Sequence, residues 1–215
     1  MIKLIDLNFG YYEPLFSNLN LEIRANQITI LQGANGSGKT TFCRLLSGLE
    51  TKYSGKILIN YEPLSNLSAK EISQKLIYLK QEPVANTVAA TPNEDLAIWQ
   101  NQFSRNLNEQ YKHEREDVLA ELMIGELLYT PFWEMSGGQI KRSAIAALLL
   151  SPRKYWILDE PTSGLHQEIV DKLFSIIERR KQNGIGALII THKIEQFQTI
   201  SDRILKIENE TINEV

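Results

Sequence analysis

The sequence has little cysteine, no long hydrophobic run and no excess of positive charge, and each absence excludes a class of protein. Cys43 is the only cysteine among the 215 residues, so the chain can form neither an internal disulfide nor a cysteine metal cluster, which indicates a reducing compartment. The longest apolar run, Ala144 to Leu150, has seven residues, whereas a membrane span needs about 20. The N-terminus also lacks the features of a signal peptide. We therefore expect a soluble chain that reaches a membrane only through a partner.

The charge balance is slightly acidic, with 23 Lys and Arg against 26 Asp and Glu and a net charge of −3. A domain that binds the nucleic-acid backbone usually carries a basic excess, so no nucleic-acid partner is expected. A small anion held at a local site is compatible with this balance. The composition, 43% hydrophobic and 23% charged, excludes a disordered chain, and the length suits one large domain or two small ones.

Short apolar runs alternate with amphipathic segments along most of the chain. This order is typical of βαβ units, which build a parallel sheet covered by helices on both faces. The middle, from about Thr91 to Trp133, has no β-rich run, and Asn106 to Leu128 is charged and amphipathic, which predicts a small helical insert. The predicted strands are 28–32, 57–59, 75–80, 155–158, 187–190 and 203–207, and the predicted helices are 39–49, 140–150 and 167–182.

Residues 33–40 match the phosphate-binding pattern G-x-x-x-x-G-K-[ST] between a predicted strand and a predicted helix. Glycines let backbone N–H groups turn inward around a phosphate, and the start of the helix adds its positive end. The ammonium of Lys39 would reach the β- and γ-phosphates, and the hydroxyl of Thr40 would ligate Mg²⁺. The alternative is a glycine-rich turn with an incidental lysine. The residues predicted to bind the nucleotide phosphates are Gly33, Ala34, Asn35, Gly36, Ser37, Gly38, Lys39, Thr40 and Thr41.

Two acidic residues, Asp159 and Glu160, follow the apolar run 155–158. The carboxyl ends of parallel strands form the ligand crevice of such a sheet. Asp159 is therefore placed to hold Mg²⁺, directly or through water, and Glu160 would polarise the attacking water. A solvated acidic strand end is the alternative, and the phosphate-binding pattern elsewhere in the chain favours the functional interpretation.

A second anion site is predicted where Ser136, Gly137, Gly138 and Gln139 precede the helix 140–150. Small residues with free N–H groups at the start of a helix can bind an anion. A single nucleotide site does not need two such helix starts. The alternative is a capped helix, because Ser136 with Gln139 three residues later fits a capping box.

Together these motifs resemble those of the ATP-binding cassette family, the ATPase subunits of ABC transporters, over nearly the whole chain. Ser136 to Gln139, after a methionine, is similar to the family's Leu-Ser-Gly-Gly-Gln signature, and Leu158 to Leu165 matches its acidic strand and following loop. Gln81 matches the glutamine that joins the family's core to its helical subdomain. His192 matches the family's switch histidine, and Tyr11 the aromatic residue that stacks on adenine.

The resemblance implies an α/β fold: a P-loop NTPase core, with a mostly parallel sheet and helices on both faces, an N-terminal antiparallel β part and an inserted helical subdomain. The chain would then be a single ABC ATPase domain of residues 1–215. Its core would comprise 1–80 and 134–215, and its helical subdomain approximately 81–133.

The resemblance also implies roles and partners. Glu160 and His192 would be catalytic, with His192 contacting the γ-phosphate, and Thr40, Gln81 and Asp159 would hold Mg²⁺ beside ATP. Two cassettes, identical or related, would pair head to tail, so that the signature of one chain closes on the ATP bound by the other. Opening and closing of this dimer would drive a transmembrane permease, which places the chain at the cytoplasmic face of the cell membrane as a peripheral subunit.

One feature of the sequence departs from the family pattern, and another resembles a subgroup of the family. The family usually has aspartate where this chain has His166, in a loop that crosses the dimer interface. A narrower resemblance links Gln81-Glu82-Pro83, Thr91 and Glu94 to Ala97 to the ATPases of energy-coupling-factor and cobalt-type importers, and here Glu82 and Pro92 depart from the pattern.

Two other functions stay open from the sequence. A soluble cassette ATPase that acts on a macromolecular complex usually has two fused cassettes or long coiled coils, and this chain shows neither pattern. A module that closes on ATP without hydrolysing it is disfavoured by Glu160 and His192.

Permease docking is predicted on the helical insert, whose position between Gln81 and Ser136 would let the nucleotide state move it as a body. Four of the aromatic residues of this region would form either part of an apolar docking groove or part of the insert's own core. They are Trp99, Phe103, Phe132 and Trp133.

Overall fold

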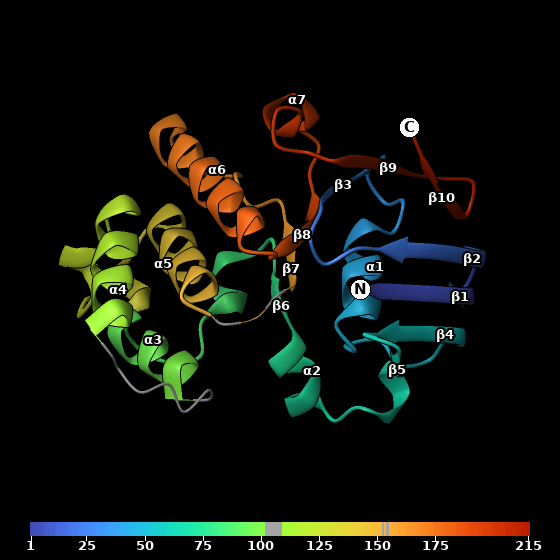
Figure 1. Ribbon diagram of the computed structural model, residues 1–215, viewed down its shortest axis with the longest axis horizontal. Helices are drawn as coiled ribbons and strands as arrows, with labels where there is room; N and C mark the ends of the chain where they lie inside the picture. The colour runs from blue at the N-terminus through green and yellow to red at the C-terminus, as the bar shows by residue number, and fades with distance from the viewer. Residues whose placement is uncertain (102–108, 152, 154) are drawn as a thin grey trace. The chain divides into compact units, whose positions relative to one another are not determined.

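The computed structural model describes residues 1–101, 109–151, 153 and 155–215, and the chain divides into two units by its internal contacts. The first unit comprises Met1–Tyr78, Arg153–Pro161 and Ile177–Val215, and the second Leu79–Pro152 and Thr162–Ile176. Figure 1 shows the order of the elements along the chain.

A mostly parallel sheet forms the first unit's centre, in the order β10-β9-β3-β8-β7-β6. Strand β3 pairs in parallel with β8 and β9, and β7 pairs in parallel with β8, while β10 is antiparallel to β9. Strands β7 and β8 are buried throughout, which explains why their sequences are apolar apart from Asp159 at the end of β7. This arrangement confirms the predicted parallel core. The strands are β3 Ile28–Gly33, β6 Leu76–Leu79, β7 Tyr155–Asp159, β8 Gly186–Ile190, β9 Arg203–Glu208 and β10 Thr211–Glu214.

An antiparallel sheet precedes it in the chain, in the order β2-β1-β4-β5. Strand β1 pairs with both β2 and β4, and the pairing with β2 shifts register three times between Leu4 and Gly10. This sheet is the expected N-terminal antiparallel part. Its strands are β1 Ile2–Gly10, β2 Pro14–Ile23, β4 Ser54–Ile59 and β5 Glu62–Pro63.

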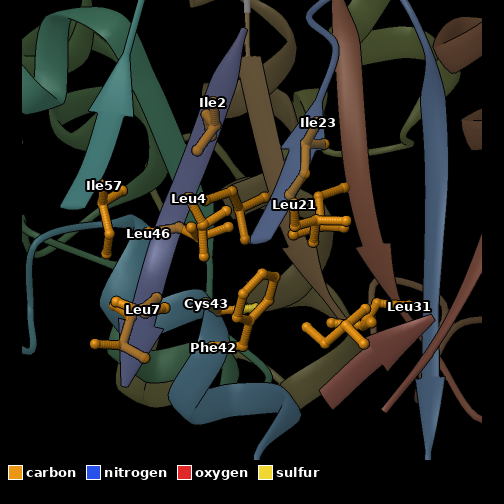
Figure 2. Packing of buried hydrophobic residues seen from close by; sticks show 14 of the residues in the cluster. Ile2, Leu4, Leu7, Leu21, Ile23, Leu31, Phe42, Cys43, Leu46 and Ile57 are labelled. Carbon is orange, nitrogen blue, oxygen red and sulfur yellow. The ribbon is translucent and has the colours of Figure 1, made fainter. Parts of the chain in front are cut away.

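Helix α1 (Lys39–Leu46) fills the core of the first unit. Its Phe42 and Cys43 are fully buried and belong to one hydrophobic cluster with Leu7 of β1 and Leu31 of β3. Figure 2 shows these α1 side chains between those of the two strands. Burial raises the pKa of the Cys43 thiol well above its usual value, so this cysteine is an inert core residue. The first unit also contains α2 (Ala69–Lys75) and α7 (Ile194–Phe197).

The second unit is mainly helical, and α5 (Gly137–Leu149) contacts α3 (Pro92–Asn101), α4 (Glu109–Glu121) and the short helix η2 (Pro83–Asn86). Because of these contacts, the second unit includes more of the chain than the helical subdomain predicted at approximately 81–133. The exact subdomain boundary stays a prediction. Within the charged segment 106–128, which predicted a helical insert, α4 ends at Glu121 and the chain leaves the helical conformation at Met123, with a φ of 53°. Two further short helices are η3 (Gly125–Leu127) and η4 (Phe132–Glu134).

A helix must be long and apolar to cross a membrane, and the sequence predicted no such helix. The longest of the described helices, α6 (Gln167–Gln182), has 16 residues, and its last turn contains three basic side chains. Among the described residues, no helix combines the length and the apolar character that crossing a bilayer requires.

Candidate functional site

The loop between β3 and α1 has the backbone shape of an anion cradle. Gly36 and Gly38 adopt φ angles of 80° and 97°, a left-handed conformation that side chains other than glycine rarely adopt. At Gly33 an added Cβ would lie 2.5 Å from the hydroxyl of Ser37, so a side chain there would collide with the loop. The Ser37 N–H donates to the Ala34 carbonyl at 3.1 Å and closes the turn directly before α1 begins at Lys39. The loop therefore offers backbone N–H groups at the start of a helix.

Two side chains of this loop fit a phosphate ligand. The Lys39 ammonium donates to the carbonyls of Gly33 and Ala34 at 2.7 and 2.8 Å, so it lies over the loop. Phosphate oxygens would form stronger, charge-assisted bonds with this ammonium than neutral carbonyls do. The hydroxyl oxygen of Ser37 is buried and makes no hydrogen bond within the described residues, although a buried polar atom normally has a partner. Both observations agree with a loop shaped for a nucleotide phosphate.

Asp159, the last residue of β7, receives two hydroxyl donors on one carboxylate oxygen. Thr40 Oγ1 donates to Asp159 Oδ2 at 2.9 Å, and the Tyr78 phenol donates to the same oxygen at 3.2 Å. Asp159 is 1% exposed, and burial raises its pKa, while these two hydrogen bonds act in the opposite direction. Burial also raises the pKa of Tyr78, which keeps the phenol a donor. The oxygens of Thr40 and Asp159 are ligands of the type that Mg²⁺ prefers.

Glu160 lies directly after Asp159 and contacts the end of β8. Its φ of 49° turns the chain out of the strand, and its N–H donates to the Ile190 carbonyl at 2.9 Å. Both the backbone N–H and the Nδ1 of His192 lie 2.9 Å from Glu160 Oε1, and Thr191 Oγ1 donates to Oε2 at 3.4 Å. The Glu160 side chain is 9% exposed and that of His192 is 62% exposed. The pair thus combines an oriented carboxylate with an accessible imidazole, an arrangement suited to general base catalysis.

The second unit holds the predicted second anion site at the start of α5. Ser136 caps this helix: its hydroxyl accepts from the Gln139 N–H at 3.3 Å, and its own N–H donates to Gln139 Oε1 at 2.7 Å. The capping box is therefore present, and the exposed Ser136 and Gly137 still lie at the helix start. A Cβ on Gly138 would lie 3.0 Å from the Gly164 carbonyl, so glycine allows this loop to approach closely.

Two further residues of the predicted site are surface residues. Gln81 is exposed in the second unit. The preceding residue, Lys80, is held by the Asn86 side-chain amide: the Lys80 N–H donates to Asn86 Oδ1 at 2.7 Å, and Asn86 Nδ2 donates to the Lys80 carbonyl at 2.9 Å. The role of Gln81 at a metal stays a prediction. In the first unit, Tyr11 is 59% exposed. Its ring makes an edge-to-face contact with Phe9, and its hydroxyl donates a hydrogen bond to Glu50 Oε1 at 3.0 Å.

The structure therefore brings together one predicted group in the first unit: the phosphate loop with Lys39 and Thr40, Asp159, and the Glu160–His192 pair. Their strands β3, β7 and β8 run parallel, so the three carboxyl ends lie at one edge of the sheet. Sequence reasoning missed Tyr78, which contacts Asp159 across 81 positions. Such a contact has no local sequence signal beyond a polar aromatic residue in a strand.

Sequence reasoning assigned no role to two buried polar residues. Thr191 is fully buried beside Glu160, and its only signal is that it precedes His192. Lys141 of α5 is 2% exposed, and its Nζ donates to the Ser163 carbonyl at 3.2 Å within the second unit. The sequence gives only a weak indication that Lys141 is buried. It follows an isoleucine at the start of an apolar helix, but most lysines are exposed.

Comparison with known proteins gives concordant matches. The profile of a family described as ABC transporter matches residues 16–163. The energy-coupling factor transporter ATP-binding protein EcfA1 of Streptococcus mutans is 33% identical over 217 residues, which cover 97% of this chain and 76% of that protein. A solved dimeric, post-hydrolysis structure of the ATP-binding cassette MJ0796 with ADP and Pi has a TM-score of 0.86 at 20% identity, and the match covers 100% of this chain and 98% of the other. The cbiO1 structure from Clostridium perfringens, part of the transporter complex cbiONQ, has a TM-score of 0.78 at 26% identity over 99% of this chain and 86% of that chain.

Proposed function

Because this chain belongs to the ABC transporter family, whose members bind and hydrolyse ATP, we propose that it couples ATP-driven dimer closure to substrate movement through a separate membrane permease. The observation that carries the proposal is the first unit's group of residues at one sheet edge. There a phosphate loop is joined to a buried carboxylate through the 2.9 Å bond from Thr40 to Asp159, next to the Glu160–His192 pair. This combination has the parts that phosphoryl transfer to water needs: a phosphate cradle, a metal-binding carboxylate and a general base.

Each of these residues would have its own role in binding or hydrolysing ATP. The loop amides and Lys39 would hold the nucleotide phosphates, and the Tyr11 ring would stack on the adenine. Thr40 and Asp159 would hold Mg²⁺, with Gln81 as a third contributor; when bound, the metal neutralises charge on the transferring phosphoryl group. Glu160 would orient and deprotonate the attacking water, and the imidazole of His192 would contact the γ-phosphate.

The second unit would act on another chain's nucleotide. The start of α5, with Ser136 and Gly138, would close on ATP held by a second cassette, identical or related, in a head-to-tail dimer. The structurally similar cassette MJ0796 has been solved as a dimer with ADP and Pi, which supports the pairing of two cassettes. It also accounts for a second anion site on a chain with one lysine-bearing phosphate loop.

We propose that the transporter is an importer of the energy-coupling-factor type. The support is the 33% identity to EcfA1 and the structural likeness to cbiO1, together with the pattern around Gln81 and Glu94 to Ala97. The chain would then lie at the cytoplasmic face of the membrane, held there by its permease.

Docking of that permease would involve the second unit's exposed apolar residues. Val84 and Val88 are each 57% exposed, and Trp133 is 75% exposed. Phe132 belongs instead to the unit's own core, where it packs with Met135. Trp99 is half-buried and its indole N–H donates to Asp95 at 3.2 Å, while Phe103 lies outside the described residues. Among the described members of the four aromatic residues considered from the sequence, Trp133 is the exposed one.

A test of the proposal uses Glu160→Gln, which keeps the size of the side chain and removes its basic carboxylate. We expect steady-state ATP hydrolysis to fall by about 10²–10⁴-fold, the usual contribution of a general base, with ATP binding retained. The same variant, tagged and supplied with ATP, should co-purify a hydrophobic membrane subunit from detergent extracts of its own cells. Undiminished turnover would remove Glu160 from the catalytic role.

The second half of the experiment separates the proposal from its alternative, a soluble non-transport ABC ATPase. Recovery of a macromolecular complex from the soluble fraction, without a membrane subunit, would favour that alternative. The matched control is Glu126→Gln, which makes the same chemical change in η3 of the second unit, outside the proposed site. It should leave both turnover and co-purification unchanged.

A further inference from the structure

We propose that Tyr78 is a positioning residue of the metal site: its phenol fixes the carboxylate of Asp159 in the orientation in which it holds Mg²⁺. The inference rests on the proposed function, since it concerns the same site. It adds a side chain that belongs to none of the sequence motifs. Tyr78 lies in β6, next to β7 in the sheet, and β7 ends at Asp159.

The Tyr78 hydroxyl is placed to donate a hydrogen bond to Asp159. Its hydroxyl lies 3.2 Å from Asp159 Oδ2, and the hydroxyl of Thr40 lies 2.9 Å from the same oxygen. Two donors from different elements, α1 and β6, thus converge on one oxygen of a carboxylate that is 1% exposed. Both donors bind Oδ2 and would restrict rotation of the carboxylate, so Oδ1 would be the oxygen available to the metal or its water.

The two donors are not equivalent toward a bound ion. Thr40 is itself a proposed metal ligand, so its hydroxyl oxygen would be shared between the metal and Asp159. Tyr78 is not placed to act as a ligand in our scheme, and its phenol serves only the carboxylate. Hydrogen bonds of this kind around metal ligands orient them, and their loss typically weakens metal affinity by about 10–100-fold.

A neighbouring tyrosine provides a matched comparison. Tyr155 begins β7, the strand that ends at Asp159, and it is 4% exposed. Its buried hydroxyl makes no hydrogen bond within the described residues. Tyr155→Phe and Tyr78→Phe therefore each remove one phenolic oxygen from adjacent strands and keep the ring, but only the second removes a donor from Asp159.

The test measures Mn²⁺ affinity with a non-hydrolysable ATP analogue bound, from the electron paramagnetic resonance signal of free Mn²⁺. We expect Tyr78→Phe to weaken Mn²⁺ binding by about tenfold, and Tyr155→Phe to leave it at the wild-type value. Binding of the analogue in EDTA, without metal, should be equal in all three proteins, because the phosphate loop is untouched. This metal-free measurement also shows that each variant is folded.

The outcomes separate the inference from the proposed function. A wild-type protein that binds neither the analogue nor Mn²⁺ would overturn the proposed function. Wild-type binding with an unchanged Mn²⁺ affinity in Tyr78→Phe would overturn only the role of Tyr78. Equal weakening in both variants would assign the effect to the packing of β6 and β7 and would also refute the positioning role.

Discussion

At the scale of single residues, the Glu160–His192 contact has two parts that mutation can separate. The backbone N–H of His192 holds Glu160 Oε1 whatever the side chain at position 192, whereas the imidazole Nδ1 adds a second contact to the same oxygen at 2.9 Å. Thr191 contacts the other carboxylate oxygen. Removing the imidazole should therefore leave the carboxylate largely in place and remove only what the ring contributes.

We accordingly expect His192→Ala to slow ATP hydrolysis by about 10²-fold, within the range for a positioned acid–base group. The apparent ATP affinity should change little, because Lys39 and its loop are unaltered. Single-turnover hydrolysis and equilibrium binding of a fluorescent ATP analogue would measure the two quantities. His113→Ala is the matched control, since that imidazole is 74% exposed on α4. A loss of affinity equal to the loss of rate would show that His192 only binds nucleotide.

The sequence was informative about residues whose role depends on a local pattern. Lys39 and Thr40 follow from the spacing of the phosphate loop, and Asp159 and Glu160 from their position after an apolar run. Tyr78 and Lys141 could not be predicted in this way, because their polar contacts join segments 81 and 22 positions apart. A single sequence contains no signal for which distant oxygen a buried donor will meet.

At the scale of elements, hydrophobic periodicity predicted long segments better than short ones. Helix α6 has the predicted bounds, 167–182, because Ile169, Leu173, Ile176 and Ile177 recur at helical spacing and are all buried. Helix α2, with seven residues and Ile72 as its only buried residue, offers no such period. Its capping box of Ser68 and Glu71 was the available signal. The bulges of β1 depend on pairing with β2 and have no pattern of their own.

Helix α5 joins the signature to the loop that follows the acidic strand. Besides the bond from Lys141 to the Ser163 carbonyl, the close approach of Gly138 to the Gly164 carbonyl fixes this loop against the helix start. The next residue, Arg142, contacts different partners: its guanidinium donates to the carbonyls of Leu122 and Met123 at 2.9 and 3.0 Å. Adjacent basic residues thus tie the helix to two separate segments of the second unit.

We expect Lys141→Met in the Glu160→Gln background to raise the ATP concentration needed for half-maximal dimerisation by about tenfold, a typical coupling between sites. The reason is that the signature would lose its fixed relation to residues 162–165. Arg142→Met removes the same charge one position later and should lower thermal stability without this effect. Analytical ultracentrifugation at increasing ATP would measure the dimer. Equal shifts in both variants would show that α5 acts only through stability.

At the scale of the whole molecule, the two predicted anion sites belong to different units. The phosphate loop is part of the first unit, and the start of α5 is part of the second. In the proposed head-to-tail dimer, each composite site takes its phosphate loop from one chain and its signature from the other. Variants that disable one part each should therefore complement one another when mixed, which a site formed within a single chain would not allow.

The two variants can be chosen to keep each unit folded. Lys39→Met removes the loop's ammonium and leaves its glycines. Ser136→Asp retains a good N-cap for α5 but adds a carboxylate that would repel the γ-phosphate of the other chain. Both are made in the Glu160→Gln background, so that bound ATP is not consumed. Labelled ATP retained after gel filtration then reports closed composite sites.

Each variant alone should retain almost no ATP, because every site in its dimers lacks one part. The equimolar mixture should retain about a quarter of what Glu160→Gln alone retains, since half of the dimers are mixed and each has one complete site. Retention should also coincide with a species of twice the 24.6 kDa mass of one chain. A mixture that retains only the sum of the separate variants would refute head-to-tail pairing between two copies of this chain, because only that pairing unites an intact phosphate loop with an intact signature from different copies.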